Sequence, residues 1–116
     1  MNEVTAFVRP FLAADEYQQD EPGDATFRSL LKKDEIPGLQ IGLVTLDGPM
    51  HKTPGTHDEF HQVYLILSGS ATVHVGGKSH RVDGPTVVVI PKQTNHSIEV
   101  GPDEKVKYAY VNQWAG

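Results

Sequence analysis

The sequence predicts an all-β fold whose short strands close into a barrel or pack as two sheets. Short apolar runs recur through residues 27–114 and are separated by turn residues. Gly76-Gly77 lies between two such runs and is a hairpin signal, because both central residues of a type I′ turn need positive φ. No stretch shows sustained helical periodicity. Many short strands at close spacing are typical of closed or double-sheet all-β architectures.

The apolar runs and their turns place the expected strands in chain order. The Ile36-Pro37-Gly38 turn separates the first two, and later runs are rich in β-branched and aromatic residues, which favour strands. Residues 87–90 are apolar throughout, so we expect that strand to be buried on both faces. The expected strands are residues 27–31, 39–46, 63–67, 71–75, 79–82, 87–90 and 105–114.

The N-terminal part differs in composition from the rest. Residues 13–24 are polar and acidic and contain a Pro22-Gly23 turn signal. We therefore expect residues 1–25 to form an arm or a short helical segment that packs on the barrel. Residues 26–116 are expected to form the barrel itself.

Composition narrows the class of protein. A chain of 116 residues favours one domain with one core. Its 10 Lys and Arg against 15 Asp and Glu give a net charge of −5, the opposite of the basic surface that nucleic acid requires. The absence of cysteine excludes thiolate metal ligands. No segment reads as a signal peptide or a membrane span, so a cytoplasmic protein without membrane or nucleic-acid partners is expected.

Two segments carry the residues that are most informative about chemistry. His57 and Gln62 stand upstream of Gly69 in the first segment, and Pro91 and His96 lie in the second. This order and spacing resembles the two-part metal motif of small single-domain cupins of the cupin 2 type. The resemblance implies a double-stranded β-helix, the jelly-roll cupin barrel, with one divalent transition metal inside it.

The resemblance also assigns the metal ligands. His57 and His96 fall in two of the histidine places and Gln62 falls in the glutamate place. An imidazole and amide set suits iron, manganese, nickel, zinc or copper. Because an amide oxygen is neutral, it leaves the site more positive than glutamate would, which favours anionic substrates. Some cupins that process uronate sugars are similar to this chain from Gln62 to Gly69.

This chain departs from the motif at Gly55, where the first histidine usually stands. The departure removes a donor, and one consequence is an open coordination position for water, substrate or dioxygen. Alternatively, the loop before His57 folds back so that His51 supplies the missing nitrogen. Pro85 and Gln93 replace the two glycines of the second segment.

Strand alternation sorts the side chains around Gln62. If Gln62 points into the barrel, Tyr64 and Ile66 share its face, because residues i and i+2 lie on one side of a strand. Val63, Leu65 and Leu67 then form an apolar opposite face. Another sheet, the N-terminal arm or a second subunit must cover that face, and we expect a homodimer.

Other histidines and the last strand give weaker signals. His61 is expected to point away from Gln62 and to be structural, and His74 and His80 flank the hairpin and are expected at the surface. Tyr108, Tyr110, Asn112 and Trp114 share one face of the last strand. That face either lines the barrel or forms an interface, and the sequence leaves both open.

These features favour a metal-dependent cupin enzyme that acts on a small oxygen-rich substrate, including anionic or sugar-acid-like molecules. Dioxygenase, isomerase and lyase chemistry all occur in cupins, and Tyr64 is the candidate for proton transfer. The alternative is a metal-free barrel that binds or senses a small molecule. A purely structural role is disfavoured because two histidines stand at the motif spacing.

Overall fold

The structure is a computed structural model that describes residues 4–17, 24–52 and 54–114. The regular elements of the described residues are β-strands apart from one short 3-10 turn, as the sequence predicts, and no helix among them is long and apolar enough to cross a membrane. In chain order the elements are η1 (Phe11–Ala13), β1 (Asp15–Tyr17), β2 (Asp24–Ile36), β3 (Leu39–Asp47), β4 (Met50–His51), β5 (Phe60–Val75), β6 (Lys78–Asp83), β7 (Thr86–Ile90), β8 (His96–Val100) and β9 (Lys105–Trp114).

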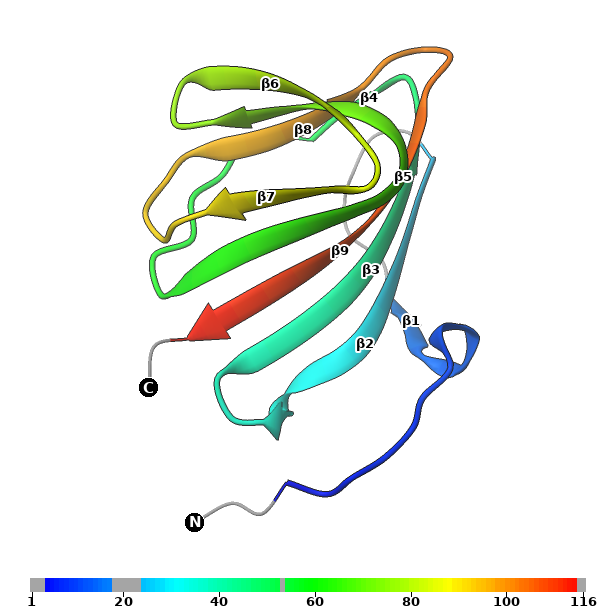
Figure 1. Ribbon diagram of the computed structural model, residues 1–116, viewed down its shortest axis with the longest axis vertical. Coiled ribbons are helices and arrows are strands. Elements are labelled where there is room, and N and C mark those ends of the chain that lie inside the picture. Colours follow the sequence, from blue (N-terminus) through cyan, green and yellow to red (C-terminus); the bar gives the residue numbers. More distant parts are fainter. Residues whose placement is uncertain (1–3, 18–23, 53, 115–116) are drawn as a thin grey trace.

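The strands curl into two antiparallel sheets that share β5 (Figure 1). The first sheet runs β1-β2-β3-β9-β5, with β7 on the other side of β5. The second contains β4, β8, the C-terminal half of β5, and β6. This arrangement is the jelly-roll barrel that the two sequence segments predict.

A bend in β5 lets one strand serve both sheets. Its register with β9 shifts between Ile66 and Ser68, and the next residue, Gly69, has φ +82°. A Cβ at Gly69 would lie 1.9 Å from the backbone oxygen of Lys105. Only glycine allows both this backbone conformation and this close approach. The bend lets the N-terminal half of β5 pair within the first sheet and its C-terminal half pair within the second.

The core confirms the predicted alternation of β5. Gln62, Tyr64 and Ile66 are buried, whereas Leu65 and Leu67 are 40% and 42% exposed. The core between the sheets also includes Phe27, Val44, Leu46, Val73, Ile98, Val100 and Val106. The hairpin prediction is also confirmed, because Gly76 and Gly77 have φ +57° and +85° and connect the paired residues Val75 and Lys78.

The prediction that residues 87–90 form a strand buried on both faces is wrong. Val87 and Val89 in β7 are 60% and 61% exposed, and only Ile90 is fully buried. Among the described residues β7 pairs with β5 alone, and no second layer covers its outer face. The apolar run therefore marks an exposed apolar face rather than a central strand.

The N-terminal arm contributes a strand to the first sheet. After η1, which ends at the start of the acidic stretch, β1 pairs with β2 through Asp15↔Ser29 and Tyr17↔Phe27. The described part of the predicted arm thus contains one short 3-10 turn and one extended strand, and residues 1–3 and 18–23 of the arm lie outside the described residues. Arg9, which lies before η1, forms a bidentate ion pair with Glu35 and so holds the start of the arm against β2.

Candidate functional site

A cavity of about 700 Å³ opens between the two sheets. Small-molecule sites typically have volumes of roughly 300–1,000 Å³. Both polar and apolar side chains line it, and they come from the arm, from β2, β3, β5, β8 and β9, and from the loop before β5. His57, Gln62, Tyr64 and His96 are all among the lining residues, so the structure brings these four predicted site residues together.

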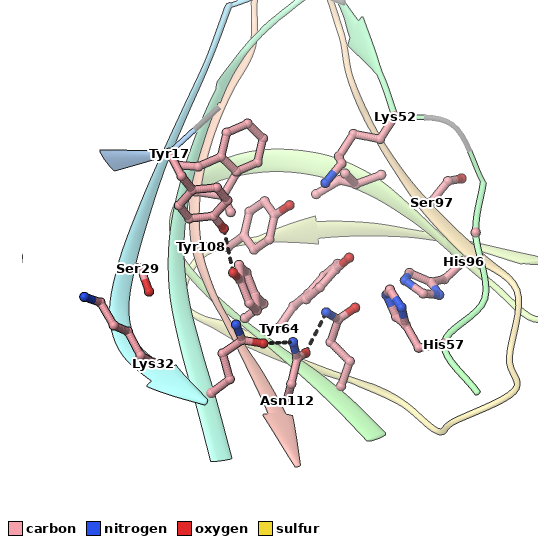
Figure 2. A pocket seen from close by; sticks show the side chains of 17 residues that line it. Tyr17, Ser29, Lys32, Lys52, His57, Tyr64, His96, Ser97, Tyr108 and Asn112 are labelled. Carbon is pink, nitrogen blue, oxygen red and sulfur yellow. Dashed lines mark hydrogen bonds between the residues drawn. The ribbon is translucent and has the colours of Figure 1, made fainter. Parts of the chain in front are cut away.

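His57 and His96 lie next to each other at one side of the cavity, with ring centroids 4.9 Å apart (Figure 2). His57 lies in the loop between β4 and β5, and His96 begins β8. Two contacts hold this loop in place. Gly55 and His96 exchange backbone hydrogen bonds of 3.0 and 2.9 Å, and the Gln93 amide donates to the His57 carbonyl across 2.6 Å. The backbone thus fixes the two imidazoles from sequence segments far apart.

The local environment orients the His96 ring and lowers the pKa of His57. Nδ1 of His96 donates to the carbonyl oxygen of Thr94 across 3.0 Å, so Nε2 is the ring nitrogen that this bond leaves available to a ligand. Burial lowers the pKa of His57 below its ordinary value, and the nearby His96 and Lys52 lower it further. A neutral imidazole is the form that binds a metal.

A row of three amides positions Gln62. Asn112 in β9 pairs with Gln40 in β3 on one side and with Gln62 in β5 on the other. Nε2 of Gln62 donates to Oδ1 of Asn112 across 2.8 Å, and Nδ2 of Asn112 donates to Oε1 of Gln40 across 3.0 Å. Both bonds are drawn as dashed lines in Figure 2. Because Gln62 uses its amide nitrogen in this row of hydrogen bonds, its amide oxygen remains available to a ligand.

The available atom is Oε1 of Gln62, which is buried and has no hydrogen-bond partner among the described residues. A buried acceptor left unpaired costs about 1–3 kcal/mol. A bound cation or donor at this oxygen would remove that cost. Gln62, His57 and His96 all line the cavity, and an amide oxygen with two imidazole nitrogens is a donor set of the kind that suits a divalent transition metal.

Gly55 leaves open space beside these donors. It lines the cavity, and a Cβ built on it would meet no atom within 4 Å. The structure therefore shows room where the cupin motif usually has its first histidine. A substrate atom or a water molecule can approach from this side.

His51 does not fill that space, which corrects the alternative in which the loop folds back. β4 pairs with β8 through Met50↔Val100 and His51↔Glu99. Because Met50 is buried in the core, alternation directs His51 to the outer face, where it is exposed. It is not a cavity-lining residue and lies near His74 and Glu99 instead.

The last strand turns its polar face inward, which decides between the two alternatives that the sequence left open. Tyr108, Tyr110 and Asn112 all line the cavity. The Tyr64 ring packs 4.7 Å from that of Tyr108 and meets the His96 ring edge-on at 6.3 Å. Tyr64 is therefore buried between the histidines and the tyrosines.

Several lining residues were missed by the sequence reasoning. Tyr17 comes from the arm, and its hydroxyl lies 2.5 Å from that of Tyr110; burial raises the pKa of both phenols. Lys52 precedes the His57 loop and extends into the cavity in Figure 2. Alternation within β3 would have found Gln40, because it shares a face with Val44. No sequence signal identifies Tyr17 or Lys52.

Comparison with known proteins agrees with this architecture. The model of the AraC-like ligand-binding domain matches residues 40–113. No protein of curated function matches the sequence. The chain belongs to the family of AraC-like ligand-binding domains, and its fold is that of a small cupin domain.

Solved structures resemble the chain over nearly its whole length. A predicted oxalate decarboxylase from Thermotoga maritima has 17% identity and a TM-score of 0.84, with 94% of this chain and 100% of that chain covered. The polyketide cyclase RemF from Streptomyces resistomycificus has 18% identity and a TM-score of 0.81, covering 94% and 80%. KdgF from Halomonas sp. has 23% identity and a TM-score of 0.74, covering 94% and 96%.

Proposed function

We propose that the cavity is the active site of a metal-dependent cupin enzyme acting on a small oxygen-rich substrate. In this proposal His57, His96 and Oε1 of Gln62 hold one divalent transition metal. The observation that carries it is the buried Gln62 oxygen, which the amide row orients and leaves without a partner. The structural relatives include a predicted oxalate decarboxylase and a polyketide cyclase, and this supports the proposal of an enzyme.

In this proposal the metal and the other residues of the cavity have separate roles in the reaction. A bound divalent metal supplies Lewis-acid polarisation of a substrate oxygen. Tyr64, which is buried next to His96, is the residue proposed to donate a proton to the substrate as a general acid. The open space at Gly55 admits the reacting part of the substrate. Apolar cavity walls from Phe27, Val44 and Ile98 exclude water around it.

The charge of the cavity favours an anionic substrate. All three proposed ligands are neutral, so none of them offsets the charge of a bound cation. Lys52 adds a positive side chain to the lining, whereas the charge of Lys32 is offset by its ion pair with Asp15. A small carboxylate or sugar acid, which has several oxygens and a negative charge, matches this surface.

A second candidate is a metal-free barrel that binds a small molecule. The family of AraC-like ligand-binding domains and the missing donor at Gly55 favour it. In this reading the unpaired Gln62 oxygen accepts a hydrogen bond from the ligand itself, and the tyrosines supply further polar contacts. Both candidates use the same cavity, so metal content distinguishes them.

The test is metal analysis of protein prepared without a histidine tag. We expect a stoichiometric transition metal, with one ion per chain lost in His57→Ala and in His96→Ala while the fold is retained. His80→Ala removes an exposed histidine outside the cavity and is the matched control. Folded wild-type protein whose metal content does not depend on His57 or His96 would favour the metal-free barrel. Gln62→Glu, which adds a charged donor, should tighten binding if Gln62 is a ligand.

We also propose that the protein is a homodimer that buries the outer face of β5 and β7. Leu65 pairs with Val87 and Val63 with Val89, so these side chains form one apolar patch. The described part of the arm does not cover it, because that part lies against β2 and β7 is the far edge of the same sheet. Contiguous exposed apolar surface is rare on monomers, which favours a second subunit as its cover.

A further inference from the structure

Three side chains suited to metal binding meet on the outer face of the second sheet, away from the cavity. His51 in β4 is the direct cross-strand partner of Glu99 in β8. Glu99 also pairs with Thr72 in β5, and His74 lies two residues further along on the same face. Strand register therefore brings His51, Glu99 and His74 together from three neighbouring strands (Figure 1).

The side chains themselves converge. Nε2 of His74 lies 3.0 Å from Oε1 of Glu99, and the rings of His51 and His74 are 6.0 Å apart. One donor atom of each residue lies within 4.8 Å of the other two. Two donors bound tetrahedrally at about 2.1 Å from one zinc ion are about 3.4 Å apart. His74 and Glu99 are already about this far apart, and His51, which is exposed, would have to move closer to them to complete a site.

A fourth residue orients this cluster. Nδ1 of His74 lies 2.7 Å from Oγ of Ser79, its cross-strand partner in β6. This contact holds the ring so that Nε2 faces Glu99. A hydrogen bond to the second ring nitrogen is the usual way in which a protein fixes a metal-binding histidine. His51 and Glu99 also border an open depression of about 330 Å³, which leaves room for water or another ligand.

We propose that His51, His74 and Glu99 form a second site for a divalent transition metal of the zinc class. Two imidazoles and one carboxylate are sufficient protein ligands for zinc and leave an open coordination position. The site is independent of the cavity and does not rest on the function proposed above. It also assigns His51, which the cavity does not use, to a ligand role on the outer face.

Zinc titration of metal-free protein by calorimetry tests this assignment. We expect His74→Ala to bind one zinc ion fewer per chain than the wild type, whether or not the cavity binds zinc. His51→Ala and Glu99→Gln should each weaken this outer binding by at least about tenfold, and Ser79→Ala by about 10-fold to 100-fold. None of the four side chains is buried, so each variant should keep the fold, and circular dichroism checks this.

Two comparisons make the result decisive. His80→Ala, at an exposed position in the neighbouring strand, should leave the stoichiometry unchanged. His57→Ala should leave the binding that depends on His74 intact, which separates this site from the cavity. Equal zinc stoichiometry in the wild type and His74→Ala would overturn the proposal, as would unchanged affinity in His51→Ala.

Discussion

The Gln62 amide nitrogen donates to Oδ1 of Asn112 across 2.8 Å, and the two residues are direct cross-strand partners in β5 and β9. Nδ2 of Asn112 in turn donates a hydrogen bond to Oε1 of Gln40, so the hydrogen bonds of the three amides run in one direction. This fixed direction leaves the Gln62 oxygen, rather than its nitrogen, available in the cavity. Asn112 is therefore a positioning residue in the proposed metal site.

Asn112→Ala should weaken metal binding in the cavity. Without the acceptor from Asn112, the Gln62 amide can turn and present either end. Loss of such supporting contacts typically lowers metal affinity by about 10-fold to 100-fold. The measurement is a zinc titration in a His74→Ala background, which removes the outer site. Gln113→Ala changes an exposed neighbour and serves as the control; equal affinities in the two variants would contradict the positioning role.

Gly55→His should strengthen metal binding in the cavity. A Cβ at this position meets nothing within 4 Å, so the imidazole has room, and the position lies beside His96 through the Gly55↔His96 bridge. A further nitrogen ligand should raise affinity by about tenfold or more, equivalent to about 1.4 kcal/mol. Thr56→His adds the same side chain one residue along and should have no such effect. If both variants bind metal like the wild type, the open space does not adjoin a metal.

Leu65→Lys and Val89→Lys should each convert the proposed homodimer to a monomer without unfolding it. Both side chains are exposed in the single chain, so neither charge disturbs the core. In a dimer each lysine would be buried without a partner, which is costly. Light scattering coupled to gel filtration measures the mass. His80→Lys, on the other sheet, is the control, and a wild-type protein that runs as a monomer at all concentrations would refute the dimer.

Tyr17→Phe should reduce stability at neutral pH by about 1 kcal/mol, because Tyr110 loses its hydrogen-bond partner. The pH dependence should change as well. Burial raises the pKa of both phenols above the ordinary value of 10.0, so this contribution is present below pH 10 and is lost as pH rises further. Urea unfolding between pH 7 and pH 11 should therefore show a shallower alkaline decline in the variant. Parallel curves for the two proteins would argue against this contact.

The predicted alternation of β5 succeeded because the period of a strand is fixed by its backbone. Once Gln62 is placed inward, Tyr64 must follow and Leu65 must point out, and the structure shows this. The prediction for Val87 and Val89 rested instead on a continuous apolar run, and it failed. An apolar run shows that a face needs covering, but whether a second sheet or a second chain covers it depends on tertiary and quaternary contacts.

The amide row and the position of His51 depend on pairing between distant segments. Gln40, Gln62 and Asn112 meet only because β9 lies between β3 and β5 with one particular register. His51 turns outward because β4 pairs with β8 in a register that buries Met50. A single sequence supplies residue types and local periodicity, but the register that selects these partners is set by the packing of the whole barrel.

The most direct test of the central claim is a crystal of His74→Ala soaked in zinc, with an anomalous difference map measured at the zinc absorption edge. The account predicts one strong peak in the cavity, within about 2.0–2.2 Å of a nitrogen of His57, a nitrogen of His96 and Oε1 of Gln62. A map with no peak among these three atoms, in crystals whose barrel is intact, would contradict the metal site.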